Sequence, residues 1–398
     1  MNSILVITNN LSQASYRLRI EQLLAPLRQR GFELRVELRP KNPFARRKLL
    51  ASAKDYDTVL LQRKLLDPSD AKLLRTSARR IVYDVDDAVM FDEKRRPGWR
   101  GRLAQWRISR RFDATASVLD CAVVGNEYLA GIFYAKTRNV IVLPTVVDPQ
   151  RYAVKEDGSE ARRHEGTEAR GEDGGEARRH EGTEARGEEE TVAEDDRLPQ
   201  SAAVDRPSTI NPPRSTLKPQ PSIQTSPLTL VWIGSRSTLP YLSSHLPALE
   251  AASAELAGNL QLLIIADATL KSEKLKILHE PWSQEREAEL LLRGDIGIAP
   301  TPLNHWTLGK CGFKIIQYMA AGLPVIASPV GANAQIVQHQ KTGFHAETPA
   351  DWTSHILTLA RNPQLRQQMG QSSRQRVETN YSITRAVETW AQVLGVEG

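Results

Sequence analysis

Two lysines and a glutamine stand at regular spacing between Gly309 and Gly322. Lys310, Lys314 and Gln317 occupy positions i, i+4 and i+7, so a helix through them would place all three on one side. Ammonium groups bind phosphate oxygens, and a helix N-terminus adds roughly half a positive charge. The spacing therefore predicts a site for a phosphorylated ligand, most simply a diphosphate. The alternative is a solvated lysine face that binds nothing.

The residues around these side chains predict a helix, a strand and a turn. Apolar residues recur at helical spacing over 315–320, and Gly322 can end the helix with positive φ. Residues 323–327 are typical of a short buried strand. Gly331 then turns the chain, and we expect it to border the ligand.

A second loop of small residues follows the strand predicted at 228–233. Gly234, Ser235 and Thr238 could offer backbone amides to a phosphate, with Arg236 as the nearby cation. Thr238 could equally be a simple helix cap, since capping and phosphate binding are compatible.

Polar side chains also follow predicted strands of the N-terminal half. Asp86 and Asp87 come after the strand at 81–83, at a carboxyl edge where a second substrate would lie. Close carboxylates need cations, hydroxyls or solvent around them, and a metal site is the alternative reading. Arg17, after the first strand, and Asn126, after the strand at 122–124, are expected to face the same cleft. For Arg17 the other interpretation is an arginine in solvent.

The pattern along the chain predicts two domains of the same kind. Short β-branched runs alternate with helical patterns over residues 1–152, and the alternation resumes over 227–381. Such alternation indicates βαβ units and parallel sheets, so we expect an α/β protein with two Rossmann-like domains. Residues 382–398 are expected to form a C-terminal helix.

Residues 153–226 interrupt this pattern. The thirteen residues 160–172 recur letter for letter as 176–188, and residues 155–200 hold 16 acidic and 8 basic side chains. Aliphatic residues are nearly absent, so the segment cannot bury enough apolar surface to offset its ordering entropy. We expect a disordered acidic insert, and an identical repeat favours a recent duplication over a selected binding surface.

Composition sets limits on location and chemistry. Cys121 and Cys311 are the two cysteines of 398 residues, too few for a disulfide framework or a cysteine metal site, which indicates a reducing compartment. The N-terminus lacks the features of a signal peptide, and no apolar run approaches the roughly 20 residues that span a bilayer. The expected location is the cytoplasm.

Residues 94–111 hold eight cations interleaved with Trp99 and Trp106. Basic residues with tryptophan are typical of an interfacial helix on anionic lipid, which would place the protein peripherally on the inner membrane face. The alternative is a solvated helix whose tryptophans fold inward. Nucleic acid is not expected as a partner, because no recognised nucleic-acid motif accompanies the charge.

Residues 317–327 read QYMAAGLPVIA and resemble the EAMACGLPVVA segment of group-1 (family 4-like) retaining glycosyltransferases, which have the GT-B fold. Residues 142–152, VLPTVVDPQRY, are similar to the segment that closes the N-terminal domain of these enzymes. The resemblance extends over nearly the whole chain outside the insert. It implies two Rossmann-like domains that face each other across a cleft, with the C-terminal helix crossing back to the first domain.

The resemblance also implies an activity: transfer of a sugar from a nucleotide-diphosphate sugar to a hydroxyl of a glycan or lipid-linked acceptor, with retention of configuration. The nucleotide sugar is the co-substrate, and neither a metal nor another cofactor is expected. Stabilisation of the leaving diphosphate falls to Lys314, Lys310 and Arg236. Donor binding falls to Gly234, Ser235, Thr238, Gln317 and Gly331, and acceptor binding to Asp86, Asp87, Arg17 and Asn126.

One departure from the family pattern keeps other functions open. Many members carry two glutamates at the positions of Gly309 and Gln317, the second of which binds the donor ribose. A glutamine still forms hydrogen bonds but supplies no negative charge. The alternatives are a GT-B epimerase or phosphorylase, or a non-catalytic carbohydrate-binding scaffold.

Overall fold

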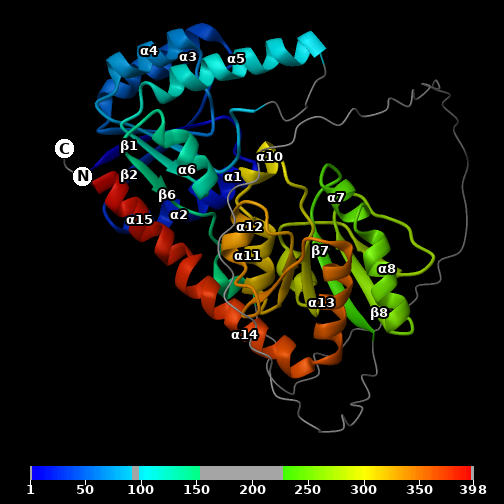
Figure 1. The fold of residues 1–398 in the computed structure, drawn as a ribbon. Helices are drawn as coiled ribbons and strands as arrows, with labels where there is room; N and C mark the ends of the chain where they lie inside the picture. Colours follow the sequence, from blue (N-terminus) through cyan, green and yellow to red (C-terminus); the bar gives the residue numbers. More distant parts are fainter. Residues whose placement is uncertain (1, 92–97, 153–226, 396–398) are drawn as a thin grey trace, which may run out of the picture. The chain divides into compact units, whose positions relative to one another are not determined.

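The computed structural model describes residues 2–91, 98–152 and 227–395, and within them the strands form two six-stranded parallel sheets. The predicted α/β class and the two Rossmann-like sheets are thereby confirmed. The predicted insert at 153–226 lies outside the described residues. Figure 1 shows the N-terminal sheet in blue to cyan and the C-terminal sheet in green to orange.

The first sheet has the strand order β2-β1-β3-β4-β5-β6. Its strands are β1 (Ser3–Thr8), β2 (Glu33–Leu38), β3 (Thr58–Gln62), β4 (Ile81–Val85), β5 (Cys121–Val124) and β6 (Val140–Val142). Its longer helices are α2 (Gln22–Gln29), α3 (Pro43–Ala51), α4 (Pro68–Ser77), α5 (Gly98–Ala116) and α6 (Glu127–Tyr134). Short helical segments are α1 (Ala14–Tyr16), the π-helix η1 (Arg17–Glu21), and the 3₁₀ segments η2 (Ser52–Asp55) and η3 (Pro149–Arg151).

Both faces of the first sheet are covered, which explains its continuous apolar strands. In β1, Leu5 and Ile7 pack in the core beneath α3 to α6, whereas Ile4 and Val6 pack in the core beneath α2 and the last helix of the chain. All four side chains are fully buried. Side chains at the carboxyl ends of these strands are therefore the ones free to face a cleft.

The second sheet has the strand order β12-β11-β10-β7-β8-β9. Its strands are β7 (Leu228–Ile233), β8 (Leu260–Ile265), β9 (Lys276–Glu280), β10 (Ile296–Ala299), β11 (Val325–Ala327) and β12 (Gly343–His345). Its helices are α7 (Leu239–Ser243), α8 (Leu246–Glu255), α9 (Glu287–Leu291), α10 (His305–Leu308), α11 (Phe313–Ala320), α12 (Ala332–Ile336), α13 (Pro349–Arg361) and α14 (Pro363–Asn380). Two apolar cores, one on each face, hold these layers together.

The helical pattern over residues 239–256 forms two helices, α7 and α8. Pro247 lies in the first turn of α8, where its missing N–H costs nothing, but a proline in the interior of one long helix would remove a hydrogen bond and clash with the preceding turn. The chain therefore restarts at Leu246.

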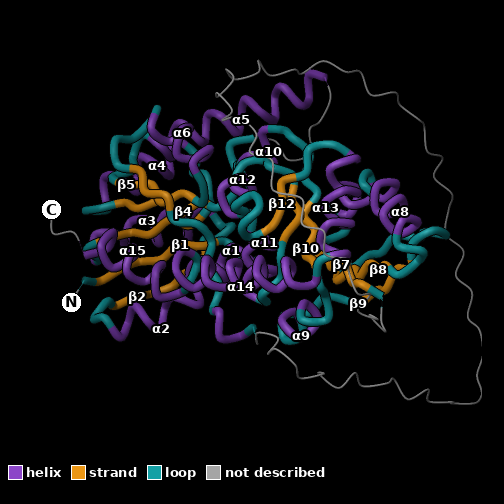
Figure 2. The backbone as a smooth tube through the Cα atoms, turned by 60° about the horizontal axis from the view of Figure 1, so that its bottom comes forward, coloured by secondary structure: helices purple, strands orange, loops and turns teal. Residues whose placement is uncertain are grey.

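The last helix, α15 (Ile383–Gly395), packs against the first sheet. Its Trp390 is 1% exposed and lies in the same core as Ile4 and Val6. Figure 2 shows α15 beside α2 and the strands β1 and β2, whereas α14, which precedes it, lies at the second sheet. The chain thus passes between the two sheets twice.

The two passages are joined by backbone hydrogen bonds. Val147, on the way out of the first sheet, pairs with Ser382, on the way back, in a parallel bridge. The Val147 amide donates to the carbonyl of Tyr381 at 3.0 Å, and the Ile383 amide donates to the carbonyl of Val147 at 3.2 Å.

A buried ion pair lies under the carboxyl edge of the first sheet. Arg19, on η1, contacts Asp84 of β4 with an Nη2–Oδ1 distance of 2.6 Å, and its Nη1 donates to the carbonyl of Leu143 at 2.8 Å. Both side chains are almost fully buried. Burial raises the pKa of Asp84, although the Arg19 charge acts in the opposite direction. The carboxylate of Asp84 is therefore engaged by Arg19 and does not line the cavity described below.

Within the described ranges, no helix has the length and apolarity needed to cross a bilayer.

Candidate functional site

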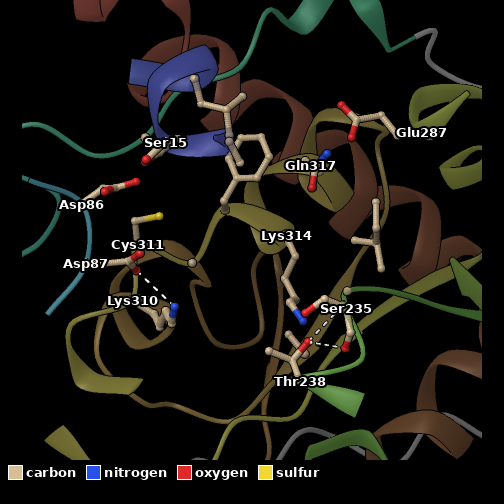
Figure 3. A pocket seen from close by; sticks show the side chains of 18 of the residues that line it. Ser15, Asp86, Asp87, Ser235, Thr238, Glu287, Lys310, Cys311, Lys314 and Gln317 are labelled. Atoms are coloured by element: carbon tan, nitrogen blue, oxygen red, sulfur yellow. Dashed lines mark hydrogen bonds and ion pairs between the residues drawn. The ribbon is translucent and has the colours of Figure 1, made fainter. Parts of the chain in front are cut away.

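A cavity of about 610 Å³ opens at the carboxyl ends of both sheets. The first half of the chain lines it with Ser15, Arg17, Asp86, Asp87 and Thr145, among others, and the second half with Gly234, Ser235, Thr238, Lys310, Lys314 and Gln317. Figure 3 shows the aspartates on one side of the cavity and Lys314, Ser235 and Thr238 on the other. Most of the side chains predicted for the site are thus brought together.

Lys314 comes from the first turn of α11, which begins at Phe313. Gly312 precedes the helix with a φ of 64°, in the left-handed region that favours glycine. The Lys314 Nζ lies 4.6 Å from the centre of the Trp232 ring. Burial, together with the charge of Lys310, lowers the pKa of Lys314 to about 8. The ammonium group is therefore poorly solvated and suited to an anionic ligand.

The predicted helical spacing of Lys310 and Lys314 is wrong, because Lys310 lies in the loop between α10 and α11. The left-handed Gly312 interrupts the helix between the two lysines. Lys310 still lines the cavity, where its Nζ lies 3.2 Å from Asp87 Oδ1 and 4.5 Å from the centre of the Trp306 ring. The two ammonium groups converge through a loop and not along one helix face.

Asn126 holds that loop in place and does not line the cavity. Its side-chain amide donates to the carbonyls of Leu308 and Lys310, at 3.2 and 2.9 Å, and its Oδ1 accepts from the amide of Leu129 to cap α6. Asn126 is 3% exposed. We expected Asn126 to contact a substrate, but it instead positions the loop that carries Lys310.

Close packing at Gly309 leaves no room for the glutamate that many members of the family carry at this position. A Cβ added there would lie 2.4 Å from the Cβ of Ala88 in the first half of the chain, closer than any real contact. The neighbouring carboxylate of Asp87 instead reaches Lys310 from the first sheet. Negative charge at this corner thus comes from the opposite side of the cavity.

The loop after β7 differs from the amide cradle that we expected. The amide of Gly234 donates to the carbonyl of Ile265 at 3.1 Å, and the amide of Ser235 to Thr238 Oγ1 at 3.2 Å. The Gly234 amide is thus engaged by β8 and the Ser235 amide by the loop itself. The hydroxyls of Ser235 and Thr238 line the cavity while they also bond within the loop. Gly234 is required because a Cβ there would lie 2.3 Å from the Trp232 ring.

Arg236 and Gly331 lie outside the cavity lining. The Arg236 side chain is 77% exposed, and its Nε lies 4.0 Å from Asp267 Oδ2. Gly331, with a φ of 55°, passes so close to the carbonyl of Leu308 that a Cβ would lie 2.6 Å from it. Both were expected at the ligand, but Arg236 faces a surface aspartate and Gly331 is a packing turn, with Asn333 lining the cavity in its place.

Asp86 and Asp87 form the opposite wall with an arginine that sequence reasoning missed. Arg63 Nη2 lies 2.6 Å from Asp87 Oδ2, and Arg63 Nε lies 4.0 Å from Asp86 Oδ1. Burial, with the charge of Asp87, raises the pKa of Asp86 to about 7. Asp86 can therefore gain or lose a proton near neutral pH. Arg63 directly follows β3, a position that could have indicated it.

Arg17 lies on η1 and lines the cavity, where its guanidinium lies 5.7 Å from the centre of the Trp282 ring. Gln317, on α11, is buried and donates from Nε2 to the hydroxyl of Tyr152 at 3.3 Å. Glu287, on α9, is a further lining residue that the sequence did not point out, because nothing in its pattern separates a buried glutamate from a solvated one.

No group of three or more histidine, cysteine, aspartate or glutamate side chains in the described ranges is arranged to hold a metal ion. The residues that line the cavity carry ammonium and guanidinium groups, hydroxyls and carboxylates.

Comparison with known proteins gives one family match. Residues 227–362 match the model of the group 1 glycosyl transferases. Two curated relatives align over shorter stretches. Spore coat protein SA of Bacillus subtilis is 32% identical over 80 residues, which cover 19% of this chain and 21% of the relative. Trehalose synthase of Pyrococcus horikoshii is 28% identical over 87 residues, which cover 22% and 21%. The chain thus spans about a fifth of the length of each relative.

Solved structures match over almost the whole length. Anabaena HepE in complex with UDP and glucose has a TM-score of 0.59 at 12% identity, with 99% of this chain and 100% of that chain covered. Sucrose-phosphate synthase from Thermosynechococcus elongatus has a TM-score of 0.61 at 12% identity, with 99% and 98% covered. At this identity the likeness concerns the fold.

Proposed function

Because residues 227–362 belong to the group 1 glycosyl transferases and the chain has the GT-B fold, we propose that this protein transfers a sugar from a nucleotide-diphosphate sugar to a hydroxyl of a glycan or lipid-linked acceptor. One observation carries the proposal. In a single cavity, Lys314 lies across from the carboxylates of Asp86 and Asp87, and Lys310 lies beside Asp87 with its Nζ 3.2 Å from Asp87 Oδ1. The lysines suit a diphosphate and the aspartates a sugar hydroxyl.

In the proposed reaction, the bond between the donor sugar and the diphosphate breaks and a bond to the acceptor oxygen forms, with retention of configuration. Negative charge develops on the leaving diphosphate, where Lys314, Lys310 and the hydroxyls of Ser235 and Thr238 stabilise it. Asp86 and Asp87 orient the acceptor hydroxyl by accepting its hydrogen bond. The acceptor hydroxyl loses its proton as the new bond forms, and Asp86, whose pKa is raised to about 7, accepts that proton at neutral pH.

A donor screen tests this function. The purified protein is incubated with UDP-, GDP- and ADP-sugars, with and without glycan or polyprenyl-linked acceptors, and products are identified by mass spectrometry. We expect donor consumption that requires an acceptor, with release of the nucleoside diphosphate. Consumption without any acceptor would indicate an epimerase or phosphorylase instead. If calorimetry detects no binding of any nucleotide sugar, a scaffold role replaces the enzymatic one.

A surface on the first half of the chain supports an anionic membrane as the place of the acceptor. On α5, Trp99, Leu103 and Trp106 stand at i, i+4 and i+7, and they are 69%, 37% and 56% exposed. This excludes the alternative in which the tryptophans fold inward. Arg100 and Arg110 lie over the two indole rings, at 5.5 and 5.7 Å. Residues 94–97 of the predicted segment lie outside the described residues.

A second exposed aromatic residue extends this surface. Phe44, at the start of α3, is 85% exposed and has the exposed Arg47 near it. Figure 1 shows α3, α4 and α5 together along one margin of the first sheet. Exposed aromatic rings flanked by arginine suit the headgroup region of an anionic bilayer. We therefore propose peripheral attachment of the protein through α5 and α3.

The membrane proposal predicts that the double variant Trp99→Ser/Trp106→Ser loses affinity for anionic vesicles by on the order of tenfold. The reason is that both indole rings would leave the headgroup region, whereas the charge stays the same. Sedimentation with phosphatidylglycerol and phosphatidylcholine vesicles measures the effect. Tyr134→Ser, which removes an exposed aromatic residue from α6, is the matched control. Equal recovery of the unmodified protein with both vesicle types would refute the attachment.

A further inference from the structure

Glu287 is a buried carboxylate with an unusual set of neighbours. The residue is 7% exposed, lies at the start of α9 and lines the cavity. The indole Nε1 of Trp282 donates to its Oε2 at 3.1 Å. Among the described residues, this is the hydrogen bond recorded for the carboxylate. A carboxylate can accept several hydrogen bonds. Glu287 at the cavity wall can therefore accept further hydrogen bonds from a ligand.

The neighbours of Glu287 define one end of the cavity. Tyr152 is close to it, since burial together with the charge of Glu287 raises the pKa of Tyr152 to about 12. Gln317 donates to the Tyr152 hydroxyl, so its amide nitrogen already has a partner inside the protein. Figure 3 shows Glu287 and Gln317 at the end of the cavity away from Asp86, Asp87 and Lys310.

The chemistry of the proposed donor fixes which part of it can reach this end. In the same view Lys314 lies below Gln317, with Ser235 and Thr238 below Lys314, and these side chains would hold the diphosphate. The sugar on one side of the diphosphate must face the acceptor wall of Asp86 and Asp87. The nucleoside, on the other side, must then extend toward Glu287. Its ribose carries two adjacent hydroxyls, which are hydrogen-bond donors that a carboxylate can accept together.

We propose that Glu287 binds the ribose diol of the donor nucleotide, held in position by the indole of Trp282. The inference rests on the proposed function. It assigns the negative charge of the ribose site to Glu287 on α9, because Gln317 on α11 is neutral. Arg17 and Arg151 of the first half of the chain lie over this region. Arg17 lies 5.7 Å from the centre of the Trp282 ring, and Arg151 donates to the carbonyl of Gln284 at 3.1 Å, so both arginines hold the loop that carries Trp282.

The test compares nucleotides with and without the diol. Calorimetry first measures binding of UDP, GDP and ADP, and the tightest binder is taken forward with its 2′,3′-dideoxy counterpart. For the unmodified protein we expect loss of the diol to weaken binding by about ten- to a hundredfold, because charge-assisted hydrogen bonds are removed. Glu287→Gln should weaken the ribonucleotide by a similar factor and leave the dideoxy nucleotide nearly unchanged.

Two further variants complete the design. Glu289→Gln, which neutralises a 65% exposed carboxylate on the same helix, should retain full discrimination. Trp282→Phe should lose part of it, because the ring stays but its N–H donor is gone. Thermal unfolding of each variant checks that the fold is kept.

The outcomes separate this inference from the function on which it rests. If the protein binds a nucleoside diphosphate but does not distinguish it from its dideoxy form, or if Glu287→Gln weakens both forms equally, the assignment of Glu287 is wrong and the donor class stands. If none of the three nucleoside diphosphates binds, the proposed function fails and this inference with it.

Discussion

Replacing Lys314 with alanine is expected to lower turnover by about a hundred- to a thousandfold, the range observed when one preorganised partner of a developing anion is removed. The Nζ of Lys314 lies over the Trp232 ring in a partly buried position, so little solvent can take over its role. Turnover of the donor identified by the screen is the measurement. The fold should persist, because the ammonium group points into a cavity and not into a core.

Controls identify the source of this loss. Lys314→Arg keeps the charge but changes its geometry, so intermediate activity is expected. Lys341→Ala removes an exposed lysine from the same half of the chain and should have no effect. Near-normal turnover of Lys314→Ala, with an unchanged melting temperature, would remove Lys314 from the mechanism.

The pH dependence gives an independent check on the same residue. The pKa of Lys314 is lowered to about 8, so in the free protein the ammonium form is lost as the pH rises through that value. A bound diphosphate favours the charged form and raises this pKa. Affinity for a nucleoside diphosphate should therefore fall above about pH 8, and Lys314→Ala should not show this fall.

Arg19→Met is expected to lower the free energy of unfolding by about 3–5 kcal/mol at pH 7, because it leaves the carboxylate of Asp84 buried without its partner. Both side chains of the pair are almost fully buried, and Arg19 also donates to the carbonyl of Leu143. Denaturant unfolding followed by circular dichroism measures the loss. The double variant Arg19→Met/Asp84→Leu should recover most of it, since neither charge then remains.

The sign of the pH effect distinguishes a lost charge partner from a packing defect. Burial already raises the folded-state pKa of Asp84 above its unfolded value, and loss of Arg19 raises it further. A carboxyl with a raised folded-state pKa costs stability as the pH rises, and that cost vanishes once the pH falls below the unfolded value. The deficit of Arg19→Met should therefore shrink toward acid pH. A deficit that stays constant would indicate lost packing instead.

Much of the fold follows from patterns that are local in the sequence. Buried parallel strands read as continuous apolar runs, so the strand predicted at 228–233 has the same bounds as β7. Because polar residues after such strands gather at one edge, Asp86 and Asp87 were placed correctly at the cavity. These predictions needed no knowledge of how the two sheets face each other.

The errors came from contacts between residues distant in the sequence. Asn126 was expected to touch substrate, but its amide serves the carbonyls of Leu308 and Lys310, roughly 180 positions later. The left-handed Gly312 displaced Lys310 from the predicted helix face. Glu287 lines the cavity because the fold places α9 beside Tyr152 and Trp282, and no local pattern in the sequence predicts that placement. Spacing reveals periodicity within an element, but not which partner a side chain finds elsewhere.

The paired backbone at Val147 and Ser382 constrains how the two halves of the protein can move. Both connecting segments are joined by hydrogen bonds at this bridge. The two halves should therefore rotate about the bridge, because a sliding motion would break its backbone hydrogen bonds. A rotation displaces atoms in proportion to their distance from the pivot. Residues on the rim of the cavity farthest from this bridge should therefore move farthest when a ligand enters, and spectroscopic labels on that rim would report the motion most sensitively.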